Sequence, residues 1–255
     1  MLFDTHTHLN DAAFEQDREE VIHRAHEEGV SLLVNVGYNR KTIEQTLELT
    51  RKYEFIYAAI GWHPHDASEL REGDLEWIEE VAKTHPKVVA IGEMGLDYYW
   101  DNSPREVQKE VFRKQIALAK RIKKPIVIHD RDAHRDVVDI LKEEGAEEVG
   151  GVMHCFGGST EIAKECLELN FYISFGGPLT FKNAKKPKEV AEAIPLERLL
   201  IETDSPYLTP HPFRGKRNES SYVRHVAQSL AEIKGVSYEE ICRITMENGR
   251  RLFRI

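Results

Sequence analysis

The segment Leu2-Phe3-Asp4-Thr5-His6-Thr7-His8 opens the chain with a short apolar run that passes directly into polar side chains. The same pattern, a brief aliphatic or β-branched run that ends in a polar or glycine-rich turn, recurs along the sequence. It is typical of a buried β-strand followed by a loop. Eight runs of this kind are predicted as strands, at residues 2–4, 31–36, 55–60, 88–91, 126–128, 151–153, 171–175 and 199–201.

The segments between these runs have helical periodicity. Apolar residues recur there at three-to-four spacing, which predicts helices at residues 15–28, 41–52, 75–84, 107–122, 162–169, 222–234 and 238–253. Ser103 is predicted as the N-cap of a helix with Pro104 at its first helical position. Ser159, followed by Glu161, is predicted to open residues 162–169 in a similar way.

Strands that alternate with helices favour parallel βα units and an α/β fold. Eight such units favour a closed TIM (β/α)8 barrel over an open doubly wound sheet. Residues 238–253 are expected to form an additional C-terminal helix beyond the last barrel helix. No stretch has the composition of a linker, so all 255 residues are predicted to form one domain.

Composition and charge limit the class of protein. Apolar residues make up 41% and charged residues 31%, which is typical of a globular protein and excludes disorder. Three cysteines fit a reducing compartment better than a disulfide framework. There is no apolar run of about 18 residues and no signal-like start, so we expect a cytoplasmic protein with no membrane partner.

The net charge is −9, which disfavours non-specific attraction to nucleic acid. An anionic substrate must therefore be held locally, by a few cations or by bound metal ions. The cysteines have no spacing that suggests a nucleophile, and none of the common nucleotide-binding motifs is present. No organic cofactor is expected.

Histidines and carboxylates cluster at the ends of the predicted strands. His6 and His8 alternate along the first strand and therefore project from one face. Val89, Ile91 and Glu93 are expected to share a face for the same reason. The carboxyl ends of barrel strands meet at one opening, where chemistry is located. We therefore predict six metal ligands there: His6, His8, Glu93, His129, His154 and Asp204.

The alternative is that each of these side chains is a solvated strand end or a hydrogen-bonded core residue. Taken one at a time, that interpretation is the ordinary one. For six polar groups above an apolar interior it is costly, because buried polar groups need partners. Six ligands are too many for one tetrahedral ion and suit two ions that share a bridging ligand.

Other side chains are candidates for substrate contact. His63 follows the strand at 55–60, and Arg131 lies two residues after His129. Arg214 lies in a basic loop after the last strand, and a solvated loop is the alternative there. Aromatic residues near the same opening either stack an unpaired base or pack their loops down: Trp62, Tyr98, Tyr99 and Trp100.

Three stretches together resemble the TatD family of metal-dependent deoxyribonucleases, within the amidohydrolase superfamily of TIM barrels. They are Leu2-Phe3-Asp4-Thr5-His6-Thr7-His8-Leu9-Asn10, Pro125-Ile126-Val127-Ile128-His129-Asp130-Arg131-Asp132-Ala133, and Leu199-Leu200-Ile201-Glu202-Thr203-Asp204-Ser205-Pro206-Tyr207-Leu208. Many amidohydrolases have a carboxylated lysine at the end of the fourth strand. Here Glu93 occupies that place, which favours the TatD family over a cyclic amidase.

The resemblance implies a site and an activity. One divalent ion would be held by His6, His8, Glu93 and Asp204, and a second by Glu93, His129 and His154. Asp204 would also act as general base toward a metal-activated water. The implied activity is 3′–5′ exonucleolytic hydrolysis of single-stranded DNA. The family implies magnesium, or manganese, whereas four imidazoles also suit zinc.

Two other functions are compatible with the same sequence. The same barrel and metal ions would suit hydrolysis of a small ester, amide or lactone. A non-catalytic barrel that uses metal for stability and binds a partner is the third alternative. A monomer is compatible with the sequence.

Overall fold

Eight strands form a single closed sheet. A computed structural model describes residues 1–255, and its strands follow one another in the order β1 to β8, each parallel to its neighbours. A parallel bridge between Thr7 and Ser205 joins the ends of β1 and β8 and closes the barrel. The strands are β1 (Leu2–Thr7), β2 (Val30–Gly37), β3 (Ile56–Ile60), β4 (Val88–Asp97), β5 (Ile126–Arg131), β6 (Gly151–Met153), β7 (Phe171–Phe175) and β8 (Leu199–Ile201).

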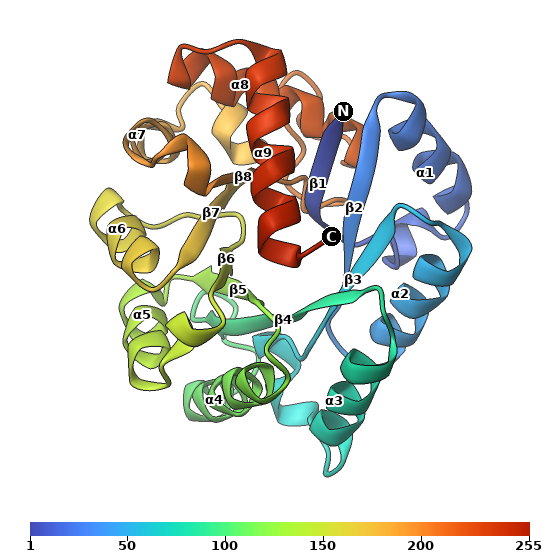
Figure 1. The fold of residues 1–255 in the computed structure, drawn as a ribbon, viewed down its shortest axis with the longest axis vertical. Coiled ribbons are helices and arrows are strands. Elements are labelled where there is room, and N and C mark those ends of the chain that lie inside the picture. The colour runs from blue at the N-terminus through green and yellow to red at the C-terminus, as the bar shows by residue number, and fades with distance from the viewer.

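Helices surround the barrel, one after each strand (Figure 1). They are α1 (Arg18–Glu27), α2 (Arg40–Lys52), α3 (Asp74–Thr84), α4 (Arg105–Ile122), α5 (His134–Glu143), α6 (Thr160–Glu168), α7 (Lys185–Ala193) and α8 (Val223–Lys234). The predicted TIM barrel is confirmed, and so is the additional C-terminal helix, α9 (Tyr238–Phe253). None of these helices has the length and apolar character needed to cross a membrane.

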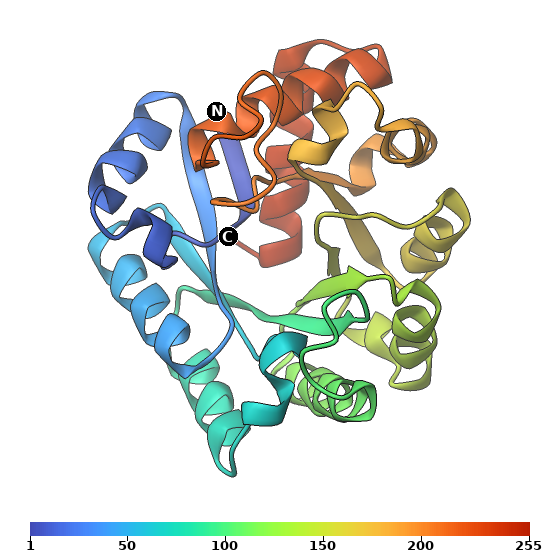
Figure 2. The ribbon, with the colours of Figure 1, turned by 180° about the vertical axis from the view of Figure 1, so that it is seen from behind.

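The additional helix α9 lies across one opening of the barrel. Figure 1 shows α9 in front of that opening, and Figure 2 shows the opposite opening with the loops that follow the strands. Phe253 at the end of α9 packs against Phe3 at the start of β1, with ring centroids 5.9 Å apart. The amino ends of the strands are therefore covered, and chemistry is confined to their carboxyl ends.

Two apolar layers position the polar side chains. An outer layer packs the helices against the strands, and an inner layer fills the barrel with one or two side chains from each strand. Val127 and Val152 belong to the inner layer. Because side chains alternate along a strand, His129 and His154, each two residues further on, also face the inside.

One predicted alternation is wrong. Val89 packs in the inner layer, but Ile91 packs in the outer layer, so these two side chains do not share a face. The pairing of β3 with β4 is irregular here, because the neighbours Ala58 and Ala59 pair with Val88 and Ala90, which leaves Val89 as an extra residue on β4. A second irregularity, in the pairing of β4 with β5, follows between Ile91 and Met94. β4 also continues to Asp97, six residues beyond the predicted end.

One of the two predicted helix starts is also wrong. Pro104, not Ser103, is the N-cap of α4, and the helix begins at Arg105. The Ser103 hydroxyl instead donates to the carbonyl of His65 at 2.8 Å, which ties it to the loop after β3. The prediction for Ser159 is confirmed, since its hydroxyl accepts a hydrogen bond from the Ile162 amide.

Candidate metal centre

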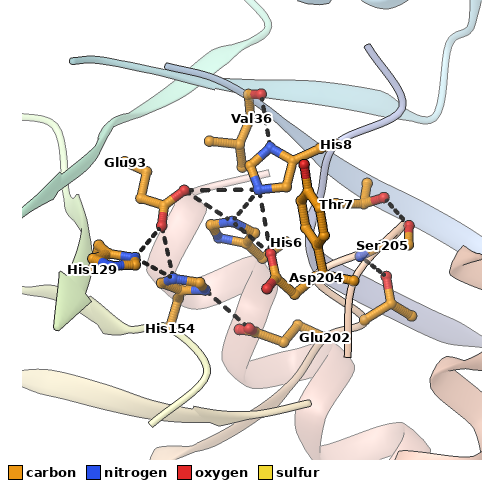
Figure 3. Close-up of polar contacts among 12 residues, drawn as sticks. His6, Thr7, His8, Val36, Glu93, His129, His154, Glu202, Asp204 and Ser205 are labelled. Atoms are coloured by element: carbon orange, nitrogen blue, oxygen red, sulfur yellow. Dashed lines mark hydrogen bonds and ion pairs between the residues drawn. The ribbon is translucent and has the colours of Figure 1, made fainter. Parts of the chain in front are cut away.

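Glu93 lies at the centre of four imidazoles, and its two oxygens face different pairs (Figure 3). Oε2 is 3.4 Å from Nε2 of His6 and 3.8 Å from Nε2 of His8, both on or just after β1. Oε1 is 2.8 Å from Nδ1 of His129 on β5 and 2.8 Å from Nε2 of His154 after β6. A single buried carboxylate therefore joins two histidine pairs that come from opposite sides of the barrel.

Asp204 joins this cluster from the loop after β8. Its Oδ1 is 3.3 Å from Nε2 of His8 and 3.7 Å from Nε2 of His6. The backbone of Asp204 has a φ of 54°, a left-handed conformation that aspartate tolerates better than most residues. The six predicted ligands are thus within one connected cluster, drawn from the carboxyl ends of five strands.

Three of the four imidazoles are fixed through their second ring nitrogen. Nε2 of His129 is 2.9 Å from Oδ2 of Asp97, and Nδ1 of His154 is 3.1 Å from Oε1 of Glu202. Nδ1 of His8 lies 3.4 Å from the carbonyl of Val36. Each contact favours a proton on the ring nitrogen that makes it, so the other ring nitrogen keeps a lone pair for a metal ion. Metal-binding histidines are usually oriented in this way.

Two further carboxylates that were not predicted from the sequence, Asp97 and Glu202, contact these histidines. Both carboxylates are fully buried, with no exposed surface. The alternation of side chains along a strand could have indicated Glu202, because it lies two residues beyond Leu200, whose side chain belongs to the inner layer. The same alternation indicates Asp97 only when β4 is known to extend to that residue.

A close approach of backbones brings β4 and β5 together at this level. Gly95 has a φ of +145°, and a Cβ at this position would lie 1.9 Å from the carbonyl oxygen of His129. Only glycine fits, because any side chain would overlap that backbone oxygen. Gly95 therefore allows the strand that provides Glu93 to pack against the strand that provides His129.

The cluster is electrostatically coupled. Burial alone would raise the pKa of Glu93, but the surrounding imidazoles, His154 and His6 foremost, hold it well below its usual value. Burial alone would lower the pKa of His154, but Glu93 and Glu202 hold it well above its usual value. Glu93 is therefore ionised throughout the ordinary pH range and available as an anionic ligand.

The donor set suits divalent cations. Nε2 of His6 and Nε2 of His8 are only 3.2 Å apart, and Nδ1 of His129 and Nε2 of His154 are 3.4 Å apart. Two groups of three have the ligand spacing of a metal site and share Glu93: His6, His8 and Glu93, and Glu93, His129 and His154. His63, His65 and His129 form another such group, as do His6, His154 and Glu202. The protein thus has histidine and glutamate clusters able to bind metal.

A cavity of about 570 Å³ opens above the cluster. Glu93, His129, His154 and Asp204 line its floor, whereas His6 lies beneath and is only 1% exposed. His63 also lines it, with Nε2 3.6 Å from Oε1 of Glu93, and burial lowers the pKa of His63 to about 4. His63 is therefore a neutral imidazole beside the predicted ligands.

The two arginines predicted to contact substrate lie in different places. Arg131 is exposed, lines the cavity and forms no ion pair; its guanidinium lies 4.4 Å from the ring centroid of Tyr99. Arg214 is exposed too, but it does not line the cavity, and its guanidinium stacks 4.0 Å from the ring of Phe181. The structure thus places Arg131, and not Arg214, at the cavity above the histidines and carboxylates.

Two of the four aromatic candidates are packed against the protein by hydrogen bonds, and the other two are exposed. Trp62 is 4% exposed, and its indole donates to the carbonyl of Asp66, so it packs its loop. Tyr98 is half-buried and donates its hydroxyl to Asp136. Tyr99 and Trp100 are 57% and 58% exposed.

A closed barrel with a buried cluster of histidines and carboxylates at its carboxyl end defines a metal-dependent hydrolase. The model of the family described as TatD related DNase matches residues 3–254. The chain belongs to the TatD family.

Relatives support this assignment. An uncharacterized metal-dependent hydrolase, YabD, of Bacillus subtilis is 65% identical over 255 residues, which cover all of both chains. The 3′-5′ ssDNA/RNA exonuclease TatD of Pectobacterium parmentieri is 35% identical, again over the whole of both chains. The crystal structure of YJJV, a TatD homologue of Escherichia coli, superposes with a TM-score of 0.94 at 31% identity, covering 100% of this chain and 98% of that one.

Proposed function

We propose that this hydrolase is a deoxyribonuclease that removes nucleotides from the 3′ end of single-stranded DNA. The observation that carries the proposal is the position of Glu93, whose oxygens face the pair His6 and His8 on one side and the pair His129 and His154 on the other. A relative at 35% identity is a 3′-5′ exonuclease on single-stranded DNA and RNA.

Two divalent ions fit this arrangement. His6, His8, Glu93 and Asp204 would hold one, and Glu93, His129 and His154 would hold the other, with Glu93 as the bridge. Divalent ions bound there would neutralise charge on a phosphodiester and lower the pKa of a coordinated water. Magnesium or manganese is the expected ion, and zinc also suits the imidazoles.

The protein's own groups would perform the remaining tasks. Oδ1 of Asp204 faces the histidines, so its Oδ2 is the atom that accepts the proton of the attacking water. Arg131, exposed and without an acidic partner, contacts the phosphate. His63, held neutral beside Glu93, contacts the substrate or orients Glu93. Charge compensation and positioning are the main catalytic contributions in phosphoryl chemistry.

The test is digestion of single-stranded oligonucleotides labelled at the 5′ or the 3′ end, with magnesium, manganese or zinc added to metal-free protein. The proposal predicts a ladder from the 5′-labelled strand and early release of labelled mononucleotide from the 3′-labelled strand. Hydrolysis of a neutral ester or lactone with no oligonucleotide cleavage under any metal would contradict it.

A further inference from the structure

Exposed apolar side chains concentrate at the mouth of the cavity above the metal cluster. Five large apolar side chains are exposed in the whole protein: Met1, Tyr99, Trp100, Tyr207 and Leu208. All except Met1 lie in the loops that follow β4 and β8. Trp100, Tyr207 and Leu208 line the cavity itself. Exposed apolar groups gathered at one place mark a surface that binds something.

Trp100 and Tyr207 approach the cavity from opposite sides. Trp100 follows β4 and Tyr207 follows β8, and these strands are diametrically opposed in an eight-stranded barrel. The side chains are 58% and 51% exposed. A planar group that enters the cavity therefore has an aromatic side chain available on either side.

Contacts to buried or nearby carboxylates hold these aromatic residues in position. The Tyr207 hydroxyl donates to Oδ2 of Asp11 at 2.7 Å. The Trp100 amide donates to Oδ1 of Asp97 at 2.8 Å, and the Trp100 ring packs edge-on against Tyr99 with centroids 5.1 Å apart. Side chains that are ordered before binding lose less entropy when a ligand arrives.

A positively charged side chain without an acidic partner lies beside these aromatic residues. Arg131 lines the same cavity, forms no ion pair and lies over the ring of Tyr99. An aromatic surface beside an unpaired arginine suits a ligand with a flat apolar part and an anionic part. A nucleotide has both, as a base and a phosphate, and bases stack on protein aromatic rings in single strands with little regard to sequence.

We propose that Trp100 and Tyr207 form a stacking clamp for the unpaired terminal base of the DNA strand. This inference rests on the proposed function and adds the feature that selects single strands. Both faces of the terminal base are needed for the clamp, and a paired base stacked in a duplex does not offer them. The cavity, at about 570 Å³, is of a size that holds a small ligand.

The test compares leucine and phenylalanine variants, because leucine keeps apolar bulk and phenylalanine also keeps the ring. The probe is a phosphorothioate-linked single strand with 2-aminopurine at its 3′ end, mixed with manganese-loaded protein. The wild type should quench the terminal 2-aminopurine, and Trp100→Leu and Tyr207→Leu should lose most of the quenching. Trp100→Phe and Tyr207→Phe should retain it, and 2-aminopurine at an internal position should respond little.

Steady-state kinetics on an unmodified single strand provide the second readout. Each leucine variant should raise KM about tenfold, with a much smaller change in kcat, because stacking binds substrate and transition state alike. Tyr57→Leu is the control, since Tyr57 lies on β3 and packs against the inner apolar layer. It should leave KM unchanged.

The outcomes separate this inference from the proposed function. If the wild type cleaves oligonucleotides but the leucine variants keep both their quenching and their KM, the stacking clamp is wrong and the nuclease stands. If the wild type neither binds nor cleaves oligonucleotides with any metal, both are wrong.

Discussion

Nε2 of His129 lies 2.9 Å from Oδ2 of Asp97, a buried carboxylate at the end of β4. The same Asp97 oxygen is 2.9 Å from Nε2 of His65, and Oδ1 accepts hydrogen bonds from the amides of Tyr99 and Trp100. One carboxylate therefore orients a predicted metal ligand and fixes the loop that carries the exposed aromatic residues.

Replacement of Asp97 is predicted to weaken metal binding. In Asp97→Asn the acceptor for the His129 N–H loses its charge, so His129 is no longer held with Nδ1 toward Glu93. We expect metal affinity to fall about 10- to 100-fold, as measured by isothermal titration of metal-free protein. Asp136→Asn, which removes the charge that faces the Tyr98 hydroxyl and Lys109 outside the site, is the control. Unchanged affinity in Asp97→Asn would show that His129 does not need this contact.

Glu93 is predicted to be indispensable to the metal pair. Glu93→Gln keeps the shape of the side chain but removes the charge that faces both histidine pairs. We expect loss of at least one bound ion per chain by elemental analysis, and a fall in nuclease rate of three orders of magnitude or more, about 4 kcal/mol of transition-state stabilisation. Full metal content with wild-type turnover would exclude the bridging role.

Replacement of Arg131 is predicted to distinguish a phosphodiester substrate from a neutral one. Arg131→Ala removes the exposed cation at the cavity mouth without disturbing the buried cluster. We expect kcat/KM on single-stranded DNA to fall about 10- to 100-fold and hydrolysis of a neutral ester, if any occurs, to change little. Arg214→Ala, which alters an exposed arginine outside the cavity, should have a smaller effect. Equal losses on both substrate types would contradict a phosphate contact at Arg131.

An ion pair outside the site gives a prediction about pH. Arg24 donates to both oxygens of Glu219, at 2.8 and 2.7 Å, and Glu219 is almost buried. Burial alone would raise the pKa of Glu219, but hydrogen bonds from Arg24 and Ser221 hold it below its usual value. The folded protein therefore binds fewer protons here than the unfolded chain, so the pair stabilises the fold above the unfolded pKa of about 4.3. This stabilisation is lost as the pH falls through the lower folded value.

Arg24→Met should accordingly lower the free energy of unfolding by about 1–3 kcal/mol at pH 7. The difference from wild type should shrink below about pH 4, as measured by urea unfolding at several pH values. Arg224→Met, which breaks an exposed pair with Glu28, should cost about 0–1 kcal/mol. A difference for Arg24→Met that grows toward low pH would contradict the assigned sign.

The sequence predicted the barrel and its six candidate ligands because both follow from short-range patterns. A strand's side chains alternate, so a histidine two residues beyond Val127 or Val152 must face the inside once those valines do. The same argument failed on β4, because the pairing of β4 shifts against β3 near Val89 and against β5 after Ile91, and such shifts depend on the neighbouring strands. Asp97 was missed for that reason, since it belongs to the part of β4 beyond these shifts.

The substrate contacts were less predictable than the ligands. Arg131 and Arg214 are both basic residues after a strand, and only the fold of the loops places one of them at the cavity. Trp62 and Trp100 likewise differ in exposure, at 4% and 58%, because one indole finds a carbonyl within its own loop. Loop conformation depends on contacts between distant segments, which residue spacing does not reveal.

The most direct measurement is the anomalous difference density of crystals grown with manganese. Two peaks on either side of Glu93 are predicted, one within coordination distance of His6, His8 and Asp204, and the other within that distance of His129 and His154. A protein that is active with manganese but has no peak in contact with Glu93 would contradict the central claim.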